Sequence, residues 1–402
     1  MISILNKNVH LLVIWLFLTS STPFIIYSWP FHPHKKFIII LMGIMVAALI
    51  KVKKVEMYTN ILYICFVLAL YYSALFCVYN DVAYLNLLLQ VISISLLSIY
   101  LAKFVGYPYF IKSFIYILIA MGIGGFIILW LHFFIGVSPL FSVNYSGPTN
   151  SYFLYLTTTN SYTDYGDLRI LRFAGFFDES GAFSMFSFFA LLLNRLYYKN
   201  KKAELLLIFF TFFSFSLAYI GSLCFYYLLF YVNRKNLYKV ISLCVFIIIC
   251  SSVLNVYKDE NPSVKRLSEL TFERLEKTED GDFKGNTRIN LQENDKQLFL
   301  KNPFFGAGLD SVRGANIYEI LAQYGLFGSL IHYSPYILLL ILIFKSSSEV
   351  KKEGLKIFLL LLINLWHRPN ISSVLSMIIT FCFIHYYISH IKTTYLKSSV
   401  SC

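Results

Sequence analysis

Two arginines and two carboxylates gather in the middle of the chain, directly before a long apolar run. The stretch reads Arg169-Ile-Leu-Arg172-Phe-Ala-Gly175-Phe-Phe-Asp178-Glu179-Ser180-Gly181. Guanidinium groups make bidentate contacts with phosphate, and a nearby carboxylate can accept a proton. One interpretation is therefore a site for an anionic headgroup with a general base. A purely structural interpretation is a salt-bridged flank, with both acids at a helix N-terminus where the helix dipole favours negative charge.

A second group of polar and glycine residues lies between 258 and 325. Arg288 opens a predicted helix over 287–300, which stops at Asn302-Pro303, and Phe304-Phe305-Gly306-Ala307-Gly308 follows as a glycine-hinged turn. After Arg313, the stretch from Asn316 to Gly328 is typical of an amphipathic helix that returns to the membrane, with Tyr318 and Glu319 in its first turn. The segment is thus expected to be partly folded.

Two short motifs in this segment have both a functional and a structural interpretation. Asp280-Gly281-Asp282 is similar to the metal-binding pair of nucleotide-sugar transferases, but nucleotide sugars are cytoplasmic and this segment is expected outside, which favours a solvated turn. Gly306-Ala-Gly308 lacks the strand–helix unit of a phosphate-binding loop. Neither outer segment contains a cysteine, so no disulfide or cysteine-based metal site is predicted there.

The composition indicates that lipid surrounds most of the chain. Hydrophobic residues make up 58% of the sequence, charged residues make up 14%, and the mean hydropathy is +0.66. A soluble domain contains about 25% charged residues. Because lipid offers no partner to unpaired backbone groups, apolar runs of bilayer-spanning length must be helical. We therefore predict an all-α, polytopic integral membrane protein in which residues 1–402 form a single membrane domain.

About 12 transmembrane helices are predicted, with two outer segments over 137–179 and 258–325. The spans are 9–29, 34–50, 58–80, 82–105, 110–136, 180–197, 203–217, 219–233, 237–257, 326–344, 354–367 and 371–391. The first outer segment is rich in tyrosine and asparagine, a mixture that suits either carbohydrate or an aromatic belt at the membrane interface. Glycines 122, 124 and 125 are interpreted as positions of close helix packing.

The net charge of +13 follows the predicted topology. With both termini in the cytoplasm, the inner connections contain 19 of the 34 Lys and Arg residues but only four of the 21 acidic residues. This is the positive-inside pattern of membrane proteins. Nucleic-acid binding is not needed to explain the charge, and we expect none.

Three motifs in this order resemble those of the O-antigen polymerase/ligase superfamily, in particular the Wzy-type polymerases of oligosaccharide repeat units. The first is Arg172-Phe-Ala-Gly175-Phe-Phe-Asp178-Glu179-Ser180. The second is Arg288 followed by Asn302-Pro303-Phe-Phe-Gly306-Ala-Gly308. The third is Asn316-Ile-Tyr318-Glu-Ile-Leu321-Ala-Gln-Tyr-Gly325-Leu-Phe-Gly328. Together they cover about 50 residues, and the topology accounts for the rest of the resemblance.

The resemblance implies an enzyme of the bacterial inner membrane with its active site on the outer face. Its substrates would be undecaprenyl-pyrophosphate-linked oligosaccharides, the product O-antigen, capsule or exopolysaccharide, and a chain-length regulator is a candidate partner besides membrane lipid. No metal or cofactor is required, because the pyrophosphate linkage already stores the energy. The catalytic candidates are Arg172, Glu179 and Arg288. The substrate-binding candidates are Arg169, Gly175, Asn302, Gly306, Gly308, Arg313, Asn316, Tyr318 and Glu319.

One departure from the family pattern bears on the mechanism. Many members, the ligases especially, have a histidine before the asparagine of the third motif, and this chain has Ala315. The departure argues against a ligase and leaves the proton acceptor open, with Glu179 and Glu319 as the nearest candidates. A flippase for lipid-linked oligosaccharides and a non-catalytic membrane scaffold are two further hypotheses for a chain of this kind.

Overall fold

A computed structural model describes residues 2–21, 24, 34–50, 59–144, 149–152, 158–161, 171–232, 249, 252–254, 256–270, 273, 276, 289–309, 316–367, 371 and 373–400. Most of these residues are α-helical. Within them, five helical stretches are long and apolar enough to cross a membrane: Asn60–Tyr79, Val82–Val105, Tyr107–Ile135, Glu319–Lys345 and Val374–Thr393. The expected mainly helical structure is thus observed, its long apolar helices are compatible with a membrane protein, and the number of twelve spans stays a prediction.

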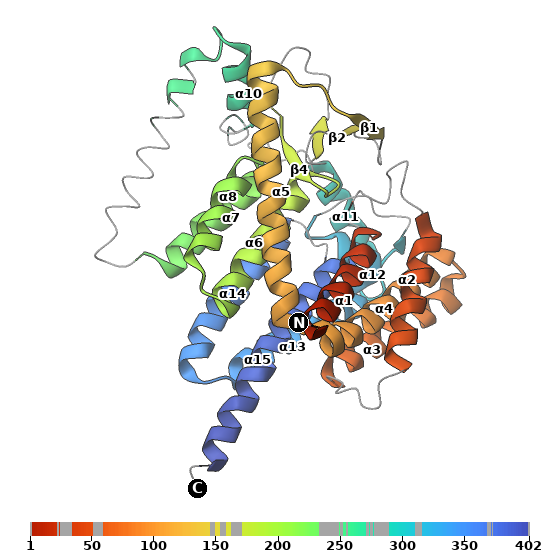
Figure 1. The fold of residues 1–402 in the computed structure, drawn as a ribbon. Helices are drawn as coiled ribbons and strands as arrows, with labels where there is room; N and C mark the ends of the chain where they lie inside the picture. The colour runs from red at the N-terminus through yellow and green to blue at the C-terminus, as the bar shows by residue number, and fades with distance from the viewer. Residues whose placement is uncertain are drawn as a thin grey trace. The chain divides into compact units, whose positions relative to one another are not determined.

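The chain forms two compact units, and the first comprises residues 1–116, 189–200 and 291–402. Figure 1 labels helices and strands of both. Its N-terminal helices are α1 (Ile2–Thr19), α2 (His34–Ile50), α3 (Thr59–Tyr79) and α4 (Val82–Tyr100), which continues into the π-helical turn η2 (Leu101–Val105). Its C-terminal helices are α11 (Ile289–Lys301), α12 (Glu319–His332), α13 (Ser334–Lys345), α14 (Ser348–His367) and α15 (Val374–Val400). Helix α4 packs on α2, α3 and α15, and both α12 and α13 pack on α3.

The helices of this unit differ in how much apolar surface they leave uncovered. The first part of α15, from Val374 to Ile384, is buried on every side, and Leu375, Ile378 and Phe381 there all have no more than 1% of their surface exposed. By contrast, Phe66 of α3 and Leu89 of α4 are 60% and 51% exposed, and Phe344 of α13 is 54% exposed. A helix that is apolar all round belongs in a core, whereas large apolar side chains on an outer face are what a lipid-facing helix requires.

The second unit comprises residues 117–188 and 201–290. It contains α7 (Lys201–Phe212), α8 (Leu217–Phe230) and α10 (Pro262–Leu270), and α5 (Tyr107–Ile135) and α6 (Ser180–Tyr197) each contribute residues to both units. Leu267 of α10 packs on a cluster of Leu129, Phe213 and Phe215.

A four-stranded antiparallel sheet occupies part of the 137–179 segment and corrects the all-α prediction there. Its order is β1 (Phe141–Asn144), β2 (Thr149–Tyr152), β3 (Thr158–Ser161) and β4 (Phe173–Gly175). Asn144 pairs with Thr149 across the connection that contains Gly147-Pro148. A turn dipeptide followed by β-branched threonines favours a hairpin, but the strands lack the apolar alternation by which strands are usually detected.

Several predicted spans match the helices, and others differ at their ends. Helices α2 and α6 have the bounds predicted for 34–50 and 180–197. Helix α7 ends at Phe212 rather than 217, because the chain turns through Phe215, whose φ is +51°. Helix α1 ends at Thr19, before Pro23, which cannot continue a helix. The predicted span 237–257 falls largely outside the described residues.

Candidate functional site

The second and third motifs meet in the first unit as two crossing backbones. Ala307 N–H donates to the Ala322 carbonyl at 2.7 Å, and Gly308 N–H donates to the Gln323 carbonyl at 3.1 Å. In the other direction, Leu326 N–H donates to the Pro303 carbonyl at 2.8 Å, and Phe327 N–H donates to that of Phe304 at 3.2 Å. Four backbone hydrogen bonds therefore join two segments that the sequence separates by about 20 residues.

Two glycines make this crossing possible. Gly306 has φ +79° and Gly325 has φ +65°, which is the left-handed region that side chains rarely adopt. A β-carbon on Gly306 would lie 2.3 Å from the Gln323 carbonyl oxygen, and one on Gly325 would lie 2.4 Å from the Phe304 carbonyl carbon. Gly325 also interrupts α12, so the expected single amphipathic helix is kinked. We call this contact between 303–308 and 322–327 the glycine crossing.

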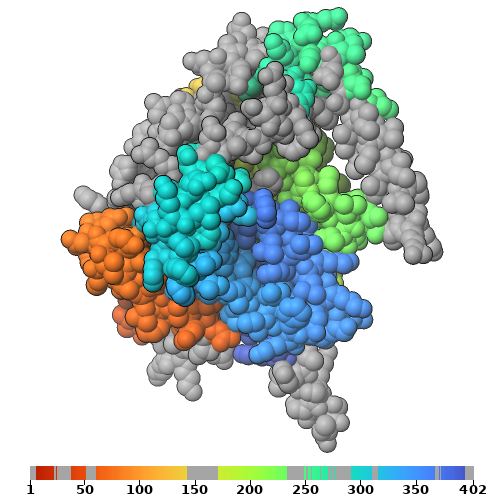
Figure 2. Space-filling view, turned by 180° about the vertical axis from the view of Figure 1, so that it is seen from behind, coloured from red at the N-terminus to blue at the C-terminus, as the bar shows by residue number. Residues whose placement is uncertain are grey.

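The glycine crossing presents exposed aromatic side chains. Phe304 and Phe305 are 54% and 71% exposed, and both rings lie near the exposed ring of Phe327, with centroids 6.0 and 5.7 Å away. Gly308 is buried, and a β-carbon there would lie 3.6 Å from the Tyr84 hydroxyl. Figure 2 shows this cyan segment beside the orange helices α3 and α4. Asn302 is exposed, and its carbonyl accepts the Gly306 N–H at 3.0 Å.

The start of α12 is organised by Asn316. Its side-chain oxygen accepts the Tyr318 N–H at 2.8 Å, and its backbone carbonyl accepts the Glu319 N–H at 3.1 Å. Its side-chain nitrogen donates to the carboxylate of Asp295 on α11. Asn316 and Asp295 are 6% and 2% exposed, whereas Tyr318 and Glu319 are half-buried. Both ends of the Asn316 amide are thus engaged within the protein.

Asp295 is a site residue that the sequence did not reveal. It lies in a stretch dense in Glu, Asn, Asp and Lys, which is typical of a solvated helix face. Burial raises the pKa of the Asp295 carboxyl, and the hydrogen bond from Asn316 opposes this shift. Only the tertiary position of α11 distinguishes Asp295 from its charged neighbours.

The first motif lies in the second unit and packs around β4. Phe173 is 1% exposed, and its ring lies against Gly125 of α5, where a β-carbon would meet the ring at 2.3 Å. Gly122 is similarly covered by Phe210, so the interpretation of Gly122 and Gly125 as packing positions is confirmed. Gly175 has φ +59°, and a β-carbon there would lie 3.0 Å from the Met121 sulfur. Gly175 therefore has a structural reason to be glycine.

Arg172 is anchored at the edge of this packing. Its Nε–H donates to the Ser214 carbonyl at 3.3 Å, in the buried turn between α7 and α8. This bond fixes the orientation of the guanidinium plane. Seven residues later, Glu179 directly precedes α6, and its carbonyl accepts the Ala182 N–H at 3.0 Å. The carboxylate of Asp178 accepts the Glu179 N–H at 2.9 Å, so both acids lie at the helix N-terminus, which agrees with the structural interpretation of this pair.

Several candidate residues lie outside the described part of the chain. They are Arg169, Arg288, Arg313, Ala315 and the Asp280-Gly281-Asp282 motif. The structure therefore joins the second and third motifs at the glycine crossing, where Gly306 and Gly308 lie against Gln323. Asn302 of the second motif and Asn316, Tyr318 and Glu319 of the third have hydrogen bonds within their own motifs. Arg172, Gly175 and Glu179 of the first motif are described in the second unit by themselves.

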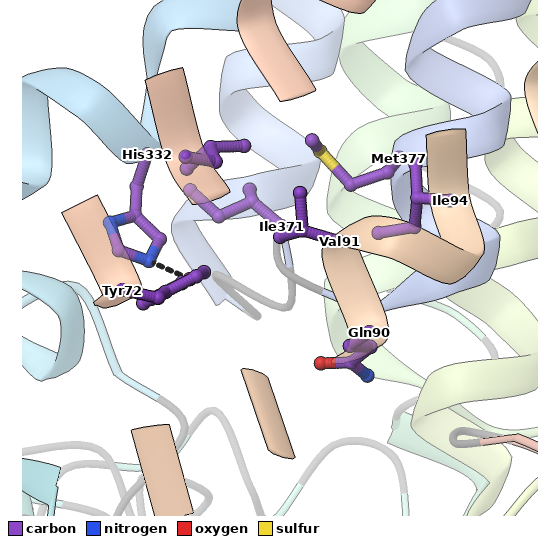
Figure 3. Close-up of a pocket in the computed structure, with 8 residues that line it drawn as sticks. Tyr72, Gln90, Val91, Ile94, His332, Ile371 and Met377 are labelled. Atoms are coloured by element: carbon purple, nitrogen blue, oxygen red, sulfur yellow. Dashed lines mark hydrogen bonds between the residues drawn. The ribbon is translucent and has the colours of Figure 1, made fainter. Parts of the chain in front are cut away.

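A small cavity lies among the helices of the first unit (Figure 3). Tyr72 and His332 lie side by side in its lining and are joined by a hydrogen bond, with 2.5 Å between Oη and Nε2. Nδ1 of His332 donates to the Gly328 carbonyl at 2.8 Å, so in the neutral ring Nε2 accepts the tyrosine proton. The volume is about 10 Å³, which is room for one water molecule. The lining residues are Leu68, Tyr72, Gln90, Val91, Ile94, His332, Ile371 and Met377.

Within the described ranges, no group of three or more His, Cys, Asp and Glu side chains is arranged to hold a metal ion. A scan against protein-family models finds no match, and a search of curated proteins finds none either. Function is therefore inferred from the three motifs and from the contacts of their residues.

Proposed function

We propose that the chain is a membrane glycosyltransferase that polymerises lipid-linked oligosaccharide repeat units. The hydroxyl at the non-reducing end of one lipid-linked unit would attack the anomeric carbon of the glycan carried by undecaprenyl pyrophosphate. The new bond is the glycosidic C–O bond, and the bond that breaks joins the anomeric carbon to the pyrophosphate. The pyrophosphate leaves with the electron pair, and the hydroxyl proton passes to a base. No metal or cofactor takes part in this scheme.

The observation that carries the proposal is the glycine crossing. The second and third motifs resemble parts of the same family, and in this chain they adjoin each other through four backbone hydrogen bonds. The crossing lies where a partly folded segment enters Glu319–Lys345, a stretch long and apolar enough to span a membrane. A rigid turn at the end of a span is a suitable support for chemistry on a substrate whose anchor lies in the bilayer.

The proposed roles follow from the charge that develops on the leaving pyrophosphate. Arg172 and Arg288 would stabilise that charge, with Arg313 and Arg169 binding the same anionic group, because guanidinium stays ionised and contacts phosphate in a bidentate manner. Glu179 is the first candidate for the base and Glu319 the second. Sugar binding would be the role of Asn302, Tyr318 and the turn that contains Gly306 and Gly308, either by direct contact or by support.

The location is part of the proposal. About twelve spans would place both termini in the cytoplasm and the 137–179 and 258–325 segments outside, in the inner membrane of a bacterium. Lipid-linked repeat units would then meet both segments on the outer face. The 19 inner basic residues against four acidic ones support this topology. A chain-length regulator is a candidate partner.

Deletion of the gene, followed by gel analysis of the surface glycan, tests the proposal. Loss of a polymerase leaves lipid carrier or core bearing a single repeat unit. Loss of a ligase or a flippase leaves no attached repeat unit at all, and loss of a scaffold unrelated to glycan leaves the ladder unchanged. Only the first result, restored to a full ladder by the intact gene, agrees with the proposal.

A further inference from the structure

Helix α11 buries a carboxylate more completely than the apolar residues beside it, since Asp295 is 2% exposed whereas Leu298 and Phe299 are only partly buried. Among its residues 291–301, whose side chains the structure describes, Asp295 is the fully buried one. Leu291 and Leu300 are 36% and 59% exposed. At the surface of the helix, the Glu293 carboxylate accepts hydrogen bonds from Lys296 at 3.4 Å and Gln297 at 2.9 Å. An amphipathic helix normally buries its apolar face, so the position of Asp295 requires another explanation.

The explanation lies in what Asp295 does to Asn316. Asn316 is its hydrogen-bond partner, and the described part of the chain contains no other, nor a cation within ion-pair distance. An ionised carboxylate only accepts hydrogen bonds, so it holds the amide nitrogen of Asn316 towards α11. The amide oxygen must then point the other way, where it accepts the Tyr318 N–H at 2.8 Å. The carboxylate thus selects one of the two orientations of the amide.

Stability by itself does not account for a carboxylate here. Burial raises the pKa of Asp295, because the charged form loses hydration that one amide hydrogen bond restores only in part. An asparagine of the same shape would accept the same hydrogen bond without that loss. An asparagine also has a donor group, so it would not act as an acceptor alone. Its hydrogen bond to Asn316 would also be weaker, because it would not be assisted by a charge. The feature that the carboxylate supplies is therefore a fixed geometry between α11 and α12.

We propose that Asp295 is a positioning residue of the polymerase site, acting through Asn316. It fastens α11, which begins at the residue after Arg288, to Asn316, which lies just before the start of α12 and forms hydrogen bonds with its first residues. Helix α12 in turn leads into the glycine crossing. The bond thereby sets the distance between the helix that follows the proposed catalytic arginine and the third motif. This inference rests on the proposed function, because it assigns Asp295 its effect on polymerisation.

A deletion strain complemented with four variants at matched membrane abundance tests the assignment. Asp295→Ala removes the acceptor, so glycan longer than one unit should fall about ten- to hundredfold, since small misplacements of catalytic groups have effects of that size. Asn316→Asp places two carboxylates together and should also lower it. Asp295→Asn retains an acceptor oxygen but not the strict acceptor character of the carboxylate, so it should lower polymerisation much less than Asp295→Ala does. The exchanged pair Asp295→Asn with Asn316→Asp restores one amide and one carboxylate and should rescue the Asn316→Asp defect.

Hydrogen exchange of the purified proteins in detergent provides a readout besides activity. Asp295→Ala should speed amide exchange over residues 289–301 about tenfold, whereas Asp295→Asn should leave it near the wild-type rate. If Asp295→Asn abolishes polymerisation and the exchanged pair does not restore it, the carboxylate itself acts in the reaction and the positioning role is wrong. A full ladder from Asp295→Ala overturns the positioning role alone. An unchanged ladder in the deletion strain overturns the proposed function, and this inference with it.

Discussion

Gly306 and Gly325 each lie so close to the backbone of the segment that contains the other that neither position has room for a β-carbon. Each has a positive φ, and each would place that carbon within 2.4 Å of a backbone atom of the opposite segment. The pair therefore does more than terminate a turn and kink a helix. It lets two motifs share backbone hydrogen bonds at the end of a span.

Alanine at either position should prevent the glycine crossing from forming. We expect Gly306→Ala and Gly325→Ala each to destabilise the protein by on the order of 3 kcal/mol or more, because a backbone clash adds to the strain of a left-handed residue. Two control variants separate these causes. Gly136→Ala adds positive-φ strain of about 1–2 kcal/mol without a clash, and Gly221→Ala meets nothing within 4 Å and has an ordinary φ. Thermal unfolding in detergent should rank the variants in that order, and equal effects of Gly136→Ala and Gly306→Ala would contradict the clash.

Arg172 should need its guanidinium and not merely its charge. Arg172→Lys keeps the positive charge but loses both the planar fork and the Nε–H that donates to Ser214, so polymerisation should fall sharply at normal abundance. Arg195→Lys, at the ion pair with Glu353, is the matched control and should have little effect. Glycan length on a gel is the measurement. If Arg172→Ala leaves the glycan length unchanged, the role of Arg172 is structural, namely to hold the turn between α7 and α8.

The buried carboxylate of Glu204 should be important for stability. It accepts hydrogen bonds from the hydroxyls of Tyr226, at 2.7 Å, and Tyr231, and from Lys201 at 3.0 Å. Glu204→Ala removes three hydrogen bonds to a buried carboxylate, so the free energy of unfolding should fall by about 2 kcal/mol or more. Glu353→Ala breaks a partly exposed ion pair and should change it by less than about 1 kcal/mol. Similar melting temperatures for the two variants would contradict the role of Glu204.

The proposed topology predicts where reporter fusions will be active. Fusions at Asn150 and Lys284 should report the outside, and fusions at Lys201 and Lys352 the cytoplasm, because basic residues concentrate in the inner connections. A cytoplasmic result at Lys284 would make chemistry at the outer surface untenable for the 258–325 segment.

Local patterns in the sequence predicted where several helices lie, but they did not predict which segments contact one another. Apolar runs bounded by charge located α2 and α6, and the proline after Asn302 located the end of α11 to within one residue. The same sequence identified Gly306 as a hinge without indicating what it crosses. The contact between residues 304 and 325 joins two separate segments of the chain. No pattern within either segment therefore predicts it.

Asp295 illustrates why part of the candidate site escaped prediction. A helix with lysine, glutamate and glutamine around it has the composition of a solvated surface, and nothing local marks one of its acids as buried. The sheet over 141–175 escaped for a related reason, since its strands are short and polar and the cross-strand pairs define them. In both cases the deciding interactions are tertiary.

The proton acceptor of the proposed reaction can be found by comparing two carboxylates. Ala315 stands where many members of the superfamily that the motifs resemble have a histidine, so in the proposed reaction the proton would pass to a carboxylate, to water or to the substrate's own phosphate. Glu179 directly precedes α6 and lies seven residues after Arg172, whereas Glu319 lies in the first turn of α12 beside Asn316. The N-terminus of a helix stabilises an ionised carboxylate, and an ionised carboxylate is what a base requires.

Glu179→Gln preserves the shape of the side chain and removes its basicity, and loss of a general base typically lowers the rate about 10²–10⁴-fold. We expect this variant to fold, to bind lipid-linked repeat units and to make mainly unpolymerised product, with Glu319→Gln as the matched variant in the other segment. If Glu179→Gln polymerises normally and Glu319→Gln does not, the base belongs to the third motif. If both polymerise at the wild-type rate, carboxylate catalysis by these residues is wrong, and the arginines would act by stabilising the leaving pyrophosphate alone.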